Sequence, residues 1–457
     1  MILNKPGILI TVSSYLVLSI ALSTKFYKAS KSVVDELFHL PQGLSYCHRD
    51  LRTWDPKITT LPGLYIFSTL ICTFIGKCTI SCLRITNILA SAINLILFYV
   101  IRQQIHPKCK FPLFNAINLA LIPPLLFFSQ LYYTDVPSVT SILGLIYFCN
   151  TGHYVHASLT GLIAILMRQT NVLFVFLFAG LRLSGLLYNY LFHDRRFINK
   201  DYKISKKDIF NLWQNVQTPD IIISKFVHLP MNICIEVGCF LTLAISFITF
   251  VIINGGIVVG DKSAHVATLH IPQLYYFSIF SLFFGWPHFV KYIIPFITSN
   301  LKNVYSFFKF ISTIFIIYIL YLYTHTTHPY LLADNRHYMF YIWKRFFNCD
   351  LYHFLWSPIF YFSLYTIFQK IYNEKDVRFA IFFTFSSFVV LCFQALVDIR
   401  YFLIPYVILR LYMKDITKLQ LIAELLTFVL VNCATFYLFF TKEIIWNDFA
   451  DIQRLIW

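Results

Sequence analysis

Long runs of apolar residues recur along the whole chain and are separated by shorter polar stretches. Continuous runs of this length are typical of membrane-spanning helices, whereas a membrane β-barrel shows short alternating segments. The pattern therefore predicts an all-α polytopic membrane protein with about 12 to 14 transmembrane helices. The predicted spans are 7–24, 61–76, 84–101, 113–131, 135–150, 154–192 (long enough for two short helices), 231–254, 273–297, 304–323, 351–371, 377–397, 399–413 and 419–441.

Two polar segments interrupt this pattern at length. Residues 193–230 are net basic, so the positive-inside rule predicts a cytoplasmic tether. Residues 25–60 combine acids with aromatic residues, which indicates a folded cap, here expected on the opposite, lumenal side. The first apolar run, 6–23, lacks a small-residue cleavage pattern and is interpreted as a retained signal anchor. We interpret the whole chain, 1–457, as one membrane domain.

The composition supports a membrane protein and argues against several other classes. Of the 457 residues, 58% are hydrophobic and only 13% are charged, roughly half the charge of a soluble protein. The formal net charge of +16 is ascribed to anionic headgroups and the positive-inside rule, because no basic face is interleaved with exposed stacking aromatics as in nucleic-acid binding proteins. The 11 cysteines show no metal-binding spacing, although Cys47 and Cys349 fall in loops predicted on one side and could form a bridge.

Two adjacent carboxylates, Asp35 and Glu36, lie near His39 and Asp55 in the first polar loop. Acids are costly near a bilayer. Desolvation and a like-charged neighbour can raise the pKa of a carboxyl group, which suits a general base. The alternative is that Asp35 caps a helix over 36–46 and that Glu36 favours the positive end of its dipole. Both interpretations remain open from this pair alone.

Five later polar stretches, 131–138, 168–171, 260–273, 328–338 and 398–402, bring charged and amide residues together. Near a membrane surface Arg and Lys commonly bind phosphate, although snorkelling accounts for most such cations. An intramembrane Arg is expected to be paired or to line a wet cavity, so Asp398 and Arg400 form either a structural pair or part of a site. The candidate binding residues are Lys57, Asp135, Arg168, Asp261, Lys262, His265, His270, Asp334, Arg336, His337 and Arg400.

The side of the membrane on which Asp135 lies is not settled by counting spans. With a cytoplasmic N-terminus, three simple spans separate the first polar loop from Asp135, which places Asp135 opposite the other polar stretches. Either one of these apolar runs is re-entrant, or Asp135 does not belong to the site.

An acid that deprotonates an acceptor hydroxyl, opposite cations that bind a departing phosphate, suits glycosyl transfer from a lipid phosphate. The same residues also suit a transporter or flippase for an anionic substrate. No internal repeat of fixed period is visible, which counts weakly against an inverted-repeat transporter. Nucleotide hydrolysis and zinc proteolysis are unsupported, because their motifs are absent.

Seven stretches keep the order of motifs known in one family of membrane enzymes: 35–39, 54–65, 131–135, 168–171, 260–275, 328–338 and 400–402. Through these stretches the sequence resembles the endoplasmic-reticulum dolichyl-phosphate-glucose-dependent α-1,2-glucosyltransferases. The resemblance implies a GT-C glycosyltransferase fold, with the active site at the lumenal face of the endoplasmic-reticulum membrane and the catalytic acid in the first lumenal loop. It also implies dolichyl-phosphate glucose as the donor and Glc2Man9GlcNAc2-diphosphodolichol as the acceptor, in the assembly of the lipid-linked oligosaccharide for protein N-glycosylation. Residues 1–29 and 406–457 carry no motif of the family.

The same resemblance suggests individual roles. The donor is β-linked and the product α-linked, so the transfer would invert configuration, with Asp35 as the general base for the acceptor 2-hydroxyl. Glu36, His39 and Asp55 would position the acceptor or the base. The residues expected to bind the donor phosphate are Lys262, Arg336 and His337. We expect no metal or other cofactor, since the leaving group is a phosphomonoester. A channel-regulatory subunit is a further alternative, which no residue pattern favours or excludes.

Overall fold

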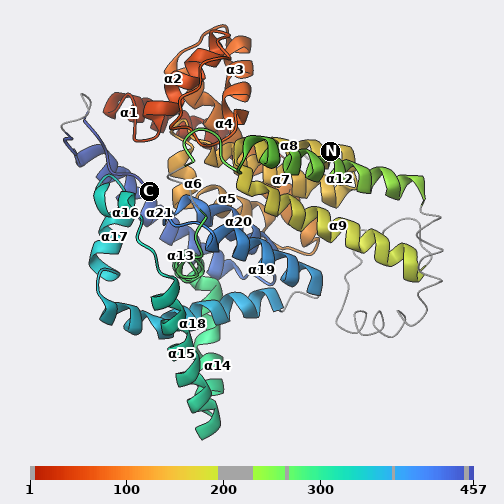
Figure 1. Ribbon diagram of the computed structural model, residues 1–457, viewed down its shortest axis with the longest axis vertical. Helices are drawn as coiled ribbons and strands as arrows, with labels where there is room; N and C mark the ends of the chain where they lie inside the picture. The colour runs from red at the N-terminus through yellow and green to blue at the C-terminus, as the bar shows by residue number, and fades with distance from the viewer. Residues whose placement is uncertain (1–5, 194–229, 263–266, 373–375, 447–451) are drawn as a thin grey trace.

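The computed structural model describes residues 6–193, 230–262, 267–372, 376–446 and 452–457, and these residues form a helical bundle (Figure 1). Within these ranges the β-pairing consists of two isolated bridges, His337 with Ile456 and Ile444 with Gln453. Residues 194–229 of the predicted basic tether (193–230) and His265 lie outside the described residues. The helices are α1 (Pro6–Ala29), α2 (Glu36–Cys47), α3 (Gly63–Ile75), α4 (Ile80–Ile105), α5 (Pro112–Ala120), α6 (Pro123–Phe128), α7 (Asp135–Thr151), α8 (Tyr154–Met167), α9 (Val172–His193), α12 (Met231–Asn254), α13 (Pro272–Phe289), α14 (Ile293–Leu301), α15 (Val304–Thr324), α16 (Pro329–Ala333), α17 (Tyr338–Phe346), α18 (Asp350–Tyr372), α19 (Val377–Cys392), α20 (Arg400–Tyr412) and α21 (Lys418–Thr441), with short 3-10 turns η1 (Gln169–Asn171) and η3 (Val290–Tyr292).

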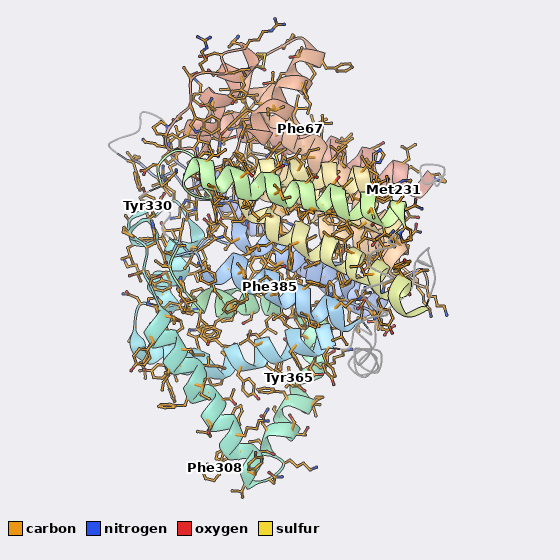
Figure 2. The ribbon with its side chains drawn as sticks, turned by 45° about the vertical axis from the view of Figure 1, so that its right-hand side comes forward. Phe67, Met231, Phe308, Tyr330, Tyr365 and Phe385 are labelled. Carbon is orange, nitrogen blue, oxygen red and sulfur yellow. A yellow bond between two sulfur atoms is a disulfide. The ribbon has the colours of Figure 1, made fainter. Side chains whose placement is uncertain are left out.

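Within the described ranges, 7 helical segments are long and apolar enough to cross a membrane, and the other predicted runs also contain helices. Large apolar side chains stand outward, among them Met231 at the start of α12 (72% exposed) and Phe308 on α15 (63% exposed) (Figure 2). Exposed apolar surface on this scale is stable in contact with lipid. The prediction of an all-α, multi-pass membrane protein is confirmed.

Helix breaks occur where the sequence supplies polar residues or proline. The run 154–192 forms two helices, as predicted, and Arg168 to Asn171 occupy the break between α8 and α9. The run 113–131 also divides, because Pro123 and Pro124 begin α6. Proline is well suited to the first turn of a helix, where its missing N–H has no intrahelical partner. These breaks place polar backbone beside the membrane-spanning helices.

The apolar run 61–76 does not form a simple span. Its helix, α3, has 13 residues and is therefore about 20 Å long, which is shorter than the hydrocarbon core of about 30 Å. It packs against α2 around the buried Leu40, Leu64 and Tyr65, so α2 and α3 together form a cap (Figure 1), which extends beyond the residues 25–60 expected from the sequence. With α3 on the same side as the first loop, only α4 and the α5–α6 pair separate that loop from Asp135. This resolves the position of Asp135: it lies on the side of the first loop.

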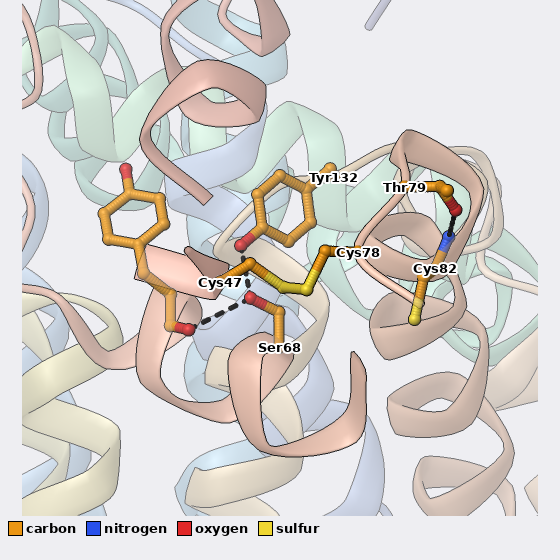
Figure 3. The surroundings of a disulfide bond; sticks show 7 residues. Cys47, Ser68, Cys78, Thr79, Cys82 and Tyr132 are labelled. Carbon is orange, nitrogen blue, oxygen red and sulfur yellow. Dashed lines mark hydrogen bonds between the residues drawn. A yellow bond between two sulfur atoms is a disulfide. The ribbon is translucent and has the colours of Figure 1, made fainter. Parts of the chain in front are cut away.

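A disulfide between Cys47 and Cys78 joins the end of α2 to the turn before α4 (Figure 3). The suggested bridge between Cys47 and Cys349 is wrong, because Cys349 is a free, exposed thiol. Beside the disulfide, the hydroxyls of Ser68 and Tyr132 share a hydrogen bond of 2.6 Å, which ties α3 to the segment before α7. The cap is thus fixed both covalently and by a buried polar contact.

Candidate active site

A cavity of about 480 Å³ lies where the first loop meets the later polar stretches. It is lined by segments that are far apart in the chain: the α1–α2 loop, the α2–α3 loop, the break after α8, the α16–α17 region, the start of α20 and Trp457. Most of the predicted site residues therefore converge on one space. The ionisable residues that line it are Asp35, His39, Lys57, Arg168, Asp261, Asp334, Arg336, His337, Asp398 and Arg400.

The turn that presents Asp35 is held in an unusual conformation. Val34 has φ +47°, a left-handed conformation that costs a β-branched residue about 1–3 kcal/mol. The Tyr133 hydroxyl accepts from the Asp35 backbone N–H at 3.0 Å and donates to the Val33 carbonyl at 3.0 Å. The Glu36 carboxylate accepts from the Val33 N–H at 3.2 Å. These contacts hold the turn and fix the direction in which the Asp35 side chain points.

The Asp35 carboxylate forms an ion pair with Arg400, with Oδ2 and Nη1 2.7 Å apart, and its side chain remains 34% exposed. Burial would raise the pKa of Asp35, but the charge and hydrogen bond of Arg400, together with the nearby His39 and His337, lower the pKa to about 2. The expectation of a raised pKa is therefore wrong. The capping alternative also fails: Asp35 occupies the N-cap position of α2, but its side chain makes no capping hydrogen bond.

Arg400 is oriented by a second carboxylate. Asp398 accepts from the Arg400 backbone N–H at 2.9 Å and pairs with the guanidinium at 2.6 Å. Burial opposes ionisation of Asp398, yet Arg400 holds its pKa below the usual value. Arg400 also lies over the Tyr133 ring, 5.5 Å from its centroid. The structural-pair and site interpretations of Asp398 and Arg400 thus both apply, because the pair itself lines the cavity.

Glu36 points away from the cavity, although it is adjacent to Asp35. Its buried carboxylate pairs with Arg84 of α4 at 2.6 Å and accepts from the Tyr132 N–H at 2.7 Å. Substrate binding by Glu36 is therefore not supported by its placement. Removal of one partner from such a buried pair strongly destabilises a fold. The Glu36–Arg84 pair therefore anchors the loop that carries Asp35.

His39 lines the cavity one helical turn after Asp35. Its Nδ1 lies 2.6 Å from the Tyr65 hydroxyl, with which it shares a hydrogen bond. Burial lowers the pKa of His39 to about 4, despite the opposing charge of Asp35. The imidazole is therefore neutral near pH 7, and it can position a hydroxyl group as a donor or an acceptor.

The polar stretches 131–138 and 168–171 meet at one wall. Asp135 is buried and pairs with Arg168 at 2.9 Å. Arg168 reaches the cavity surface, and its guanidinium lies 5.5 Å from the centroid of the Tyr401 ring. Asp135 is thus behind the wall, where it orients Arg168.

The opposite wall is built by the segment before α17. Asp334 pairs with Arg336 at 2.8 Å and lies 3.6 Å from the His337 ring nitrogen. Although burial opposes ionisation, hydrogen bonding to Arg336 lowers the pKa of Asp334. Arg336 also lies over the Trp446 ring, 4.4 Å from its centroid. The guanidinium is therefore held in one orientation at the cavity.

The loop after α12 reaches the cavity through Asp261, whose N–H donates to the Pro56 carbonyl at 2.7 Å. Gly260 has φ +66°, and a Cβ there would lie 2.4 Å from the Pro56 oxygen, so this approach requires glycine. Lys57, on the facing loop, lines the cavity with its Nζ 4.8 Å from the centroid of the Phe38 ring. Together these contacts close the cavity beside the cap.

Besides Glu36 and Asp135, three other predicted residues that the structure describes do not line the cavity. Asp55 accepts from the Lys57 N–H at 2.9 Å and shapes that loop. Lys262 is exposed and donates to the Asn254 carbonyl at the end of α12. His270 is buried beside α19, 3.3 Å from the Gln394 carbonyl, and burial lowers its pKa to about 4. Direct contacts of Lys262 and His270 with a ligand in this cavity are not supported by their placement.

The match to known proteins decides the family. The sequence model described as the DIE2/ALG10 family matches residues 29–411. The chain belongs to the DIE2/ALG10 family. The resemblance seen in the sequence is confirmed.

Curated relatives in the DIE2/ALG10 family match the chain from end to end or nearly so. A Drosophila melanogaster protein is 35% identical over 100% of both chains, and a Homo sapiens protein is 33% identical over 93% of both. Each is named Dol-P-Glc:Glc(2)Man(9)GlcNAc(2)-PP-Dol alpha-1,2-glucosyltransferase. Among solved structures, the archaeal oligosaccharyltransferase AglB from Archaeoglobus fulgidus aligns with 93% of this chain and 56% of its own, at 12% identity and a TM-score of 0.42.

Several residues that support the site were not predicted from the sequence. Arg84, Tyr133 and Tyr401 hold or line the cavity from within apolar runs or motifs. An arginine one turn inside an apolar run must be paired, so Arg84 carried a usable signal. Trp457 lies beyond the residues that the DIE2/ALG10 model matches, and no local pattern marks it. The described residues contain no group of three His, Cys, Asp or Glu side chains that could hold a metal.

Proposed function

We propose that this protein transfers glucose from dolichyl-phosphate glucose to Glc2Man9GlcNAc2-diphosphodolichol through an α-1,2 linkage. The activity named for its full-length relatives supports the reaction. The observation that carries the proposal is the cavity itself, in which an ionised carboxylate on one wall and an oriented guanidinium on another border the same space. A base and an anion-binding group on one cavity are what this transfer needs.

In this reaction Asp35 is the general base. The acceptor 2-hydroxyl oxygen attacks the anomeric carbon, the bond from that carbon to the phosphate oxygen breaks, and the hydroxyl proton passes to Asp35. Dolichyl phosphate leaves with the bonding electrons. A carboxylate with a pKa of about 2 is a weak base, but the attacking oxygen becomes strongly acidic as it bonds to an oxocarbenium-like carbon. Asp35 therefore needs to be ionised and aligned more than it needs to be basic.

Arg336, His337 and Lys57 form the proposed phosphate pole. Arg336 presents a guanidinium fixed by Asp334, and a fixed fork is suited to phosphate oxygens. His337 and Lys57 add donors on the same cavity. Charge that develops on the departing phosphate is stabilised best by donors that are already oriented. Arg168, held by Asp135, is available to hydroxyl groups of the sugars.

The site is assigned to the lumenal face of the endoplasmic-reticulum membrane. The Cys47–Cys78 disulfide lies on the side of the cavity, and disulfides persist in oxidising compartments such as the endoplasmic-reticulum lumen. The family resemblance supports the same compartment. We further expect catalysis without a metal, so that activity in the presence of a chelator equals activity in its absence.

The decisive experiment is transfer by the purified, reconstituted protein. Radiolabelled dolichyl-phosphate glucose and the diglucosylated acceptor should give a product that is one hexose larger, with the new glucose α-1,2-linked. An acceptor that already carries three glucoses is the matched control and should take up no label. Equal labelling of both acceptors, or a β-linked product, would contradict the proposal. No observation favours the transporter or the channel-regulatory alternative, and the relatives named above are glucosyltransferases.

A further inference from the structure

The last described segment, residues 452–457, is built into the wall of the cavity. It returns from α21 by pairing with the chain just after that helix, where Ile444 and Gln453 exchange backbone hydrogen bonds of 3.0 and 2.9 Å. Gln453 and Ile456 are fully buried, and Leu455 is 8% exposed. A segment buried in this way is an integral part of the fold.

Its backbone determines the conformation of the residues that carry the phosphate pole. The Ile456 N–H donates to the Arg336 carbonyl at 2.8 Å, and the Tyr338 N–H donates to the Ile456 carbonyl at 2.9 Å. These two hydrogen bonds enclose His337 in a parallel bridge. His337 is consequently held extended at the start of α17, with its Nδ1 3.2 Å from the Trp457 backbone oxygen.

Its side chains complete the surroundings of Arg336. Nε and Nη2 of Arg336 bind Asp334, whereas Nη1 is directed at the Gln453 side-chain oxygen, 3.4 Å away. Trp457 packs on Tyr338, with ring centroids 5.0 Å apart, and itself lines the cavity. Asp334, Trp446 and Gln453 thus restrain the guanidinium from three sides.

We propose that Gln453, Ile456 and Trp457 form a positioning element for the donor subsite, in which Gln453 orients Arg336, the Ile456 backbone holds His337, and Trp457 forms the adjoining wall. The inference rests on the proposed function, because it assigns Arg336 and His337 to the donor phosphate. Gln453 is a positioning residue: it acts through Arg336 and does not contact the reacting atoms.

The test compares two neighbouring residues in the purified full-length protein. Gln453→Met keeps the side-chain volume but removes the acceptor for Arg336, and Gln453→Glu restores an acceptor. Arg454→Ala is the matched control, because Arg454 binds the carbonyls of Ala29, Phe440 and Lys442, away from the cavity. The measurements are KM for dolichyl-phosphate glucose, KM for the acceptor, and kcat.

Gln453→Met should raise the donor KM by about threefold to tenfold, less than the loss of a whole charge-assisted contact, because Asp334 still holds the guanidinium of Arg336. The acceptor KM should stay within about twofold. Gln453→Glu should restore the donor KM, and Arg454→Ala should leave it unchanged. If Gln453→Met yields no folded protein, Trp457→Leu provides the second variant and should also raise the donor KM selectively.

Equal effects of Gln453→Met and Arg454→Ala on the donor KM would contradict the proposal, and so would a loss confined to kcat without rescue by Gln453→Glu. Either result would show that the segment only stabilises the fold. Failure of the wild-type protein to transfer glucose would overturn the proposed function instead. The two failures are therefore distinguishable in one set of assays.

Discussion

Two walls of the cavity contain the same three-residue unit, Asp-x-Arg, but the two arginines contact different partners. In Asp398–Arg400 and in Asp334–Arg336, the aspartate accepts from the backbone N–H of the arginine two residues on and also pairs with its guanidinium. Arg400 then meets a second carboxylate, Asp35, whereas Arg336 meets Gln453 and the Trp446 ring. The first unit therefore keeps Asp35 ionised, and in the proposed function the second offers a cation to the donor phosphate.

A third unit shows that the local geometry alone does not make a site. Asp376 and Arg378 form the same paired turn, but Arg378 donates to the Leu181 carbonyl and Ser184 hydroxyl of α9. The unit is a compact way to orient a guanidinium in or near a membrane, where an unpaired arginine is costly. What the guanidinium meets decides the function, and the third unit provides an internal control.

The largest effect is expected when the Asp35 carboxylate, which pairs with Arg400, loses its charge. Asp35→Asn should lower kcat by about 10²–10⁴-fold, because it removes the general base. Transfer assays on the reconstituted variant measure this loss, and its thermal unfolding midpoint should remain close to that of the wild type. Asp376→Asn is the control and should retain most activity. Near-normal turnover by Asp35→Asn would exclude the base assignment.

The next test addresses the opposite wall. Arg336→Ala should raise KM for dolichyl-phosphate glucose by about 10–100-fold, since a charge-assisted phosphate contact is worth about 1.5–3 kcal/mol. The acceptor KM should change far less. Titration of the donor at saturating acceptor measures the effect. An unchanged donor KM would remove Arg336 from the phosphate pole.

A pH profile sharpens the difference between the two arginines. Arg400 lowers the pKa of Asp35 to about 2, so the wild-type enzyme should show no loss of activity from Asp35 protonation above about pH 4. Arg400→Gln removes this charge while burial remains, so the pKa of Asp35 should rise and the acid limb of kcat should move up by about 1–3 pH units. Rate measurements from pH 4 to 8 test this. An acid limb that does not move would show that Arg400 does not control Asp35.

The smallest effect is expected at the third unit. Arg378→Gln should leave both KM values within about twofold of the wild type, because Arg378 contacts α9 and does not line the cavity. Its effect should fall on the thermal unfolding midpoint instead. If Arg378→Gln raised the donor KM as strongly as Arg336→Ala, both effects would reflect a general loss of stability and not donor binding.

Hydropathy predicted nearly all the helices, because the need to bury backbone polar groups in lipid leaves few alternatives. The run that misled about sidedness was 61–76, whose 13-residue helix stays with the cap. That single error placed Asp135 on the uncertain side, and it also separated Cys78 from Cys47 across the membrane. The disulfide could not be proposed while the run was counted as a span.

Motif positions predicted which residues converge, but not what each one contacts. Asp35 and Glu36 are adjacent in sequence, yet their side chains diverge to Arg400 and Arg84, 365 and 48 residues away. Lys262 stands in a matching stretch and still turns toward the end of α12. Residues 452–457 have no local signal, because their role arises from tertiary pairing with residues 336–338. Such partnerships are fixed by packing of the whole bundle.

The cap and the ion pair of Asp35, the proposed general base, differ in when they can be completed during synthesis. Both cysteines of the Cys47–Cys78 bridge are present once 78 residues have been made, and segments near the N-terminus of a growing chain generally fold first. Asp35 acquires Arg400, which lies 365 residues after it in the chain, only much later. A ribosome-bound intermediate would thus hold a finished cap around an aspartate without its counter-ion, and competence for glucosyl transfer would arrive as one of the last events of membrane insertion.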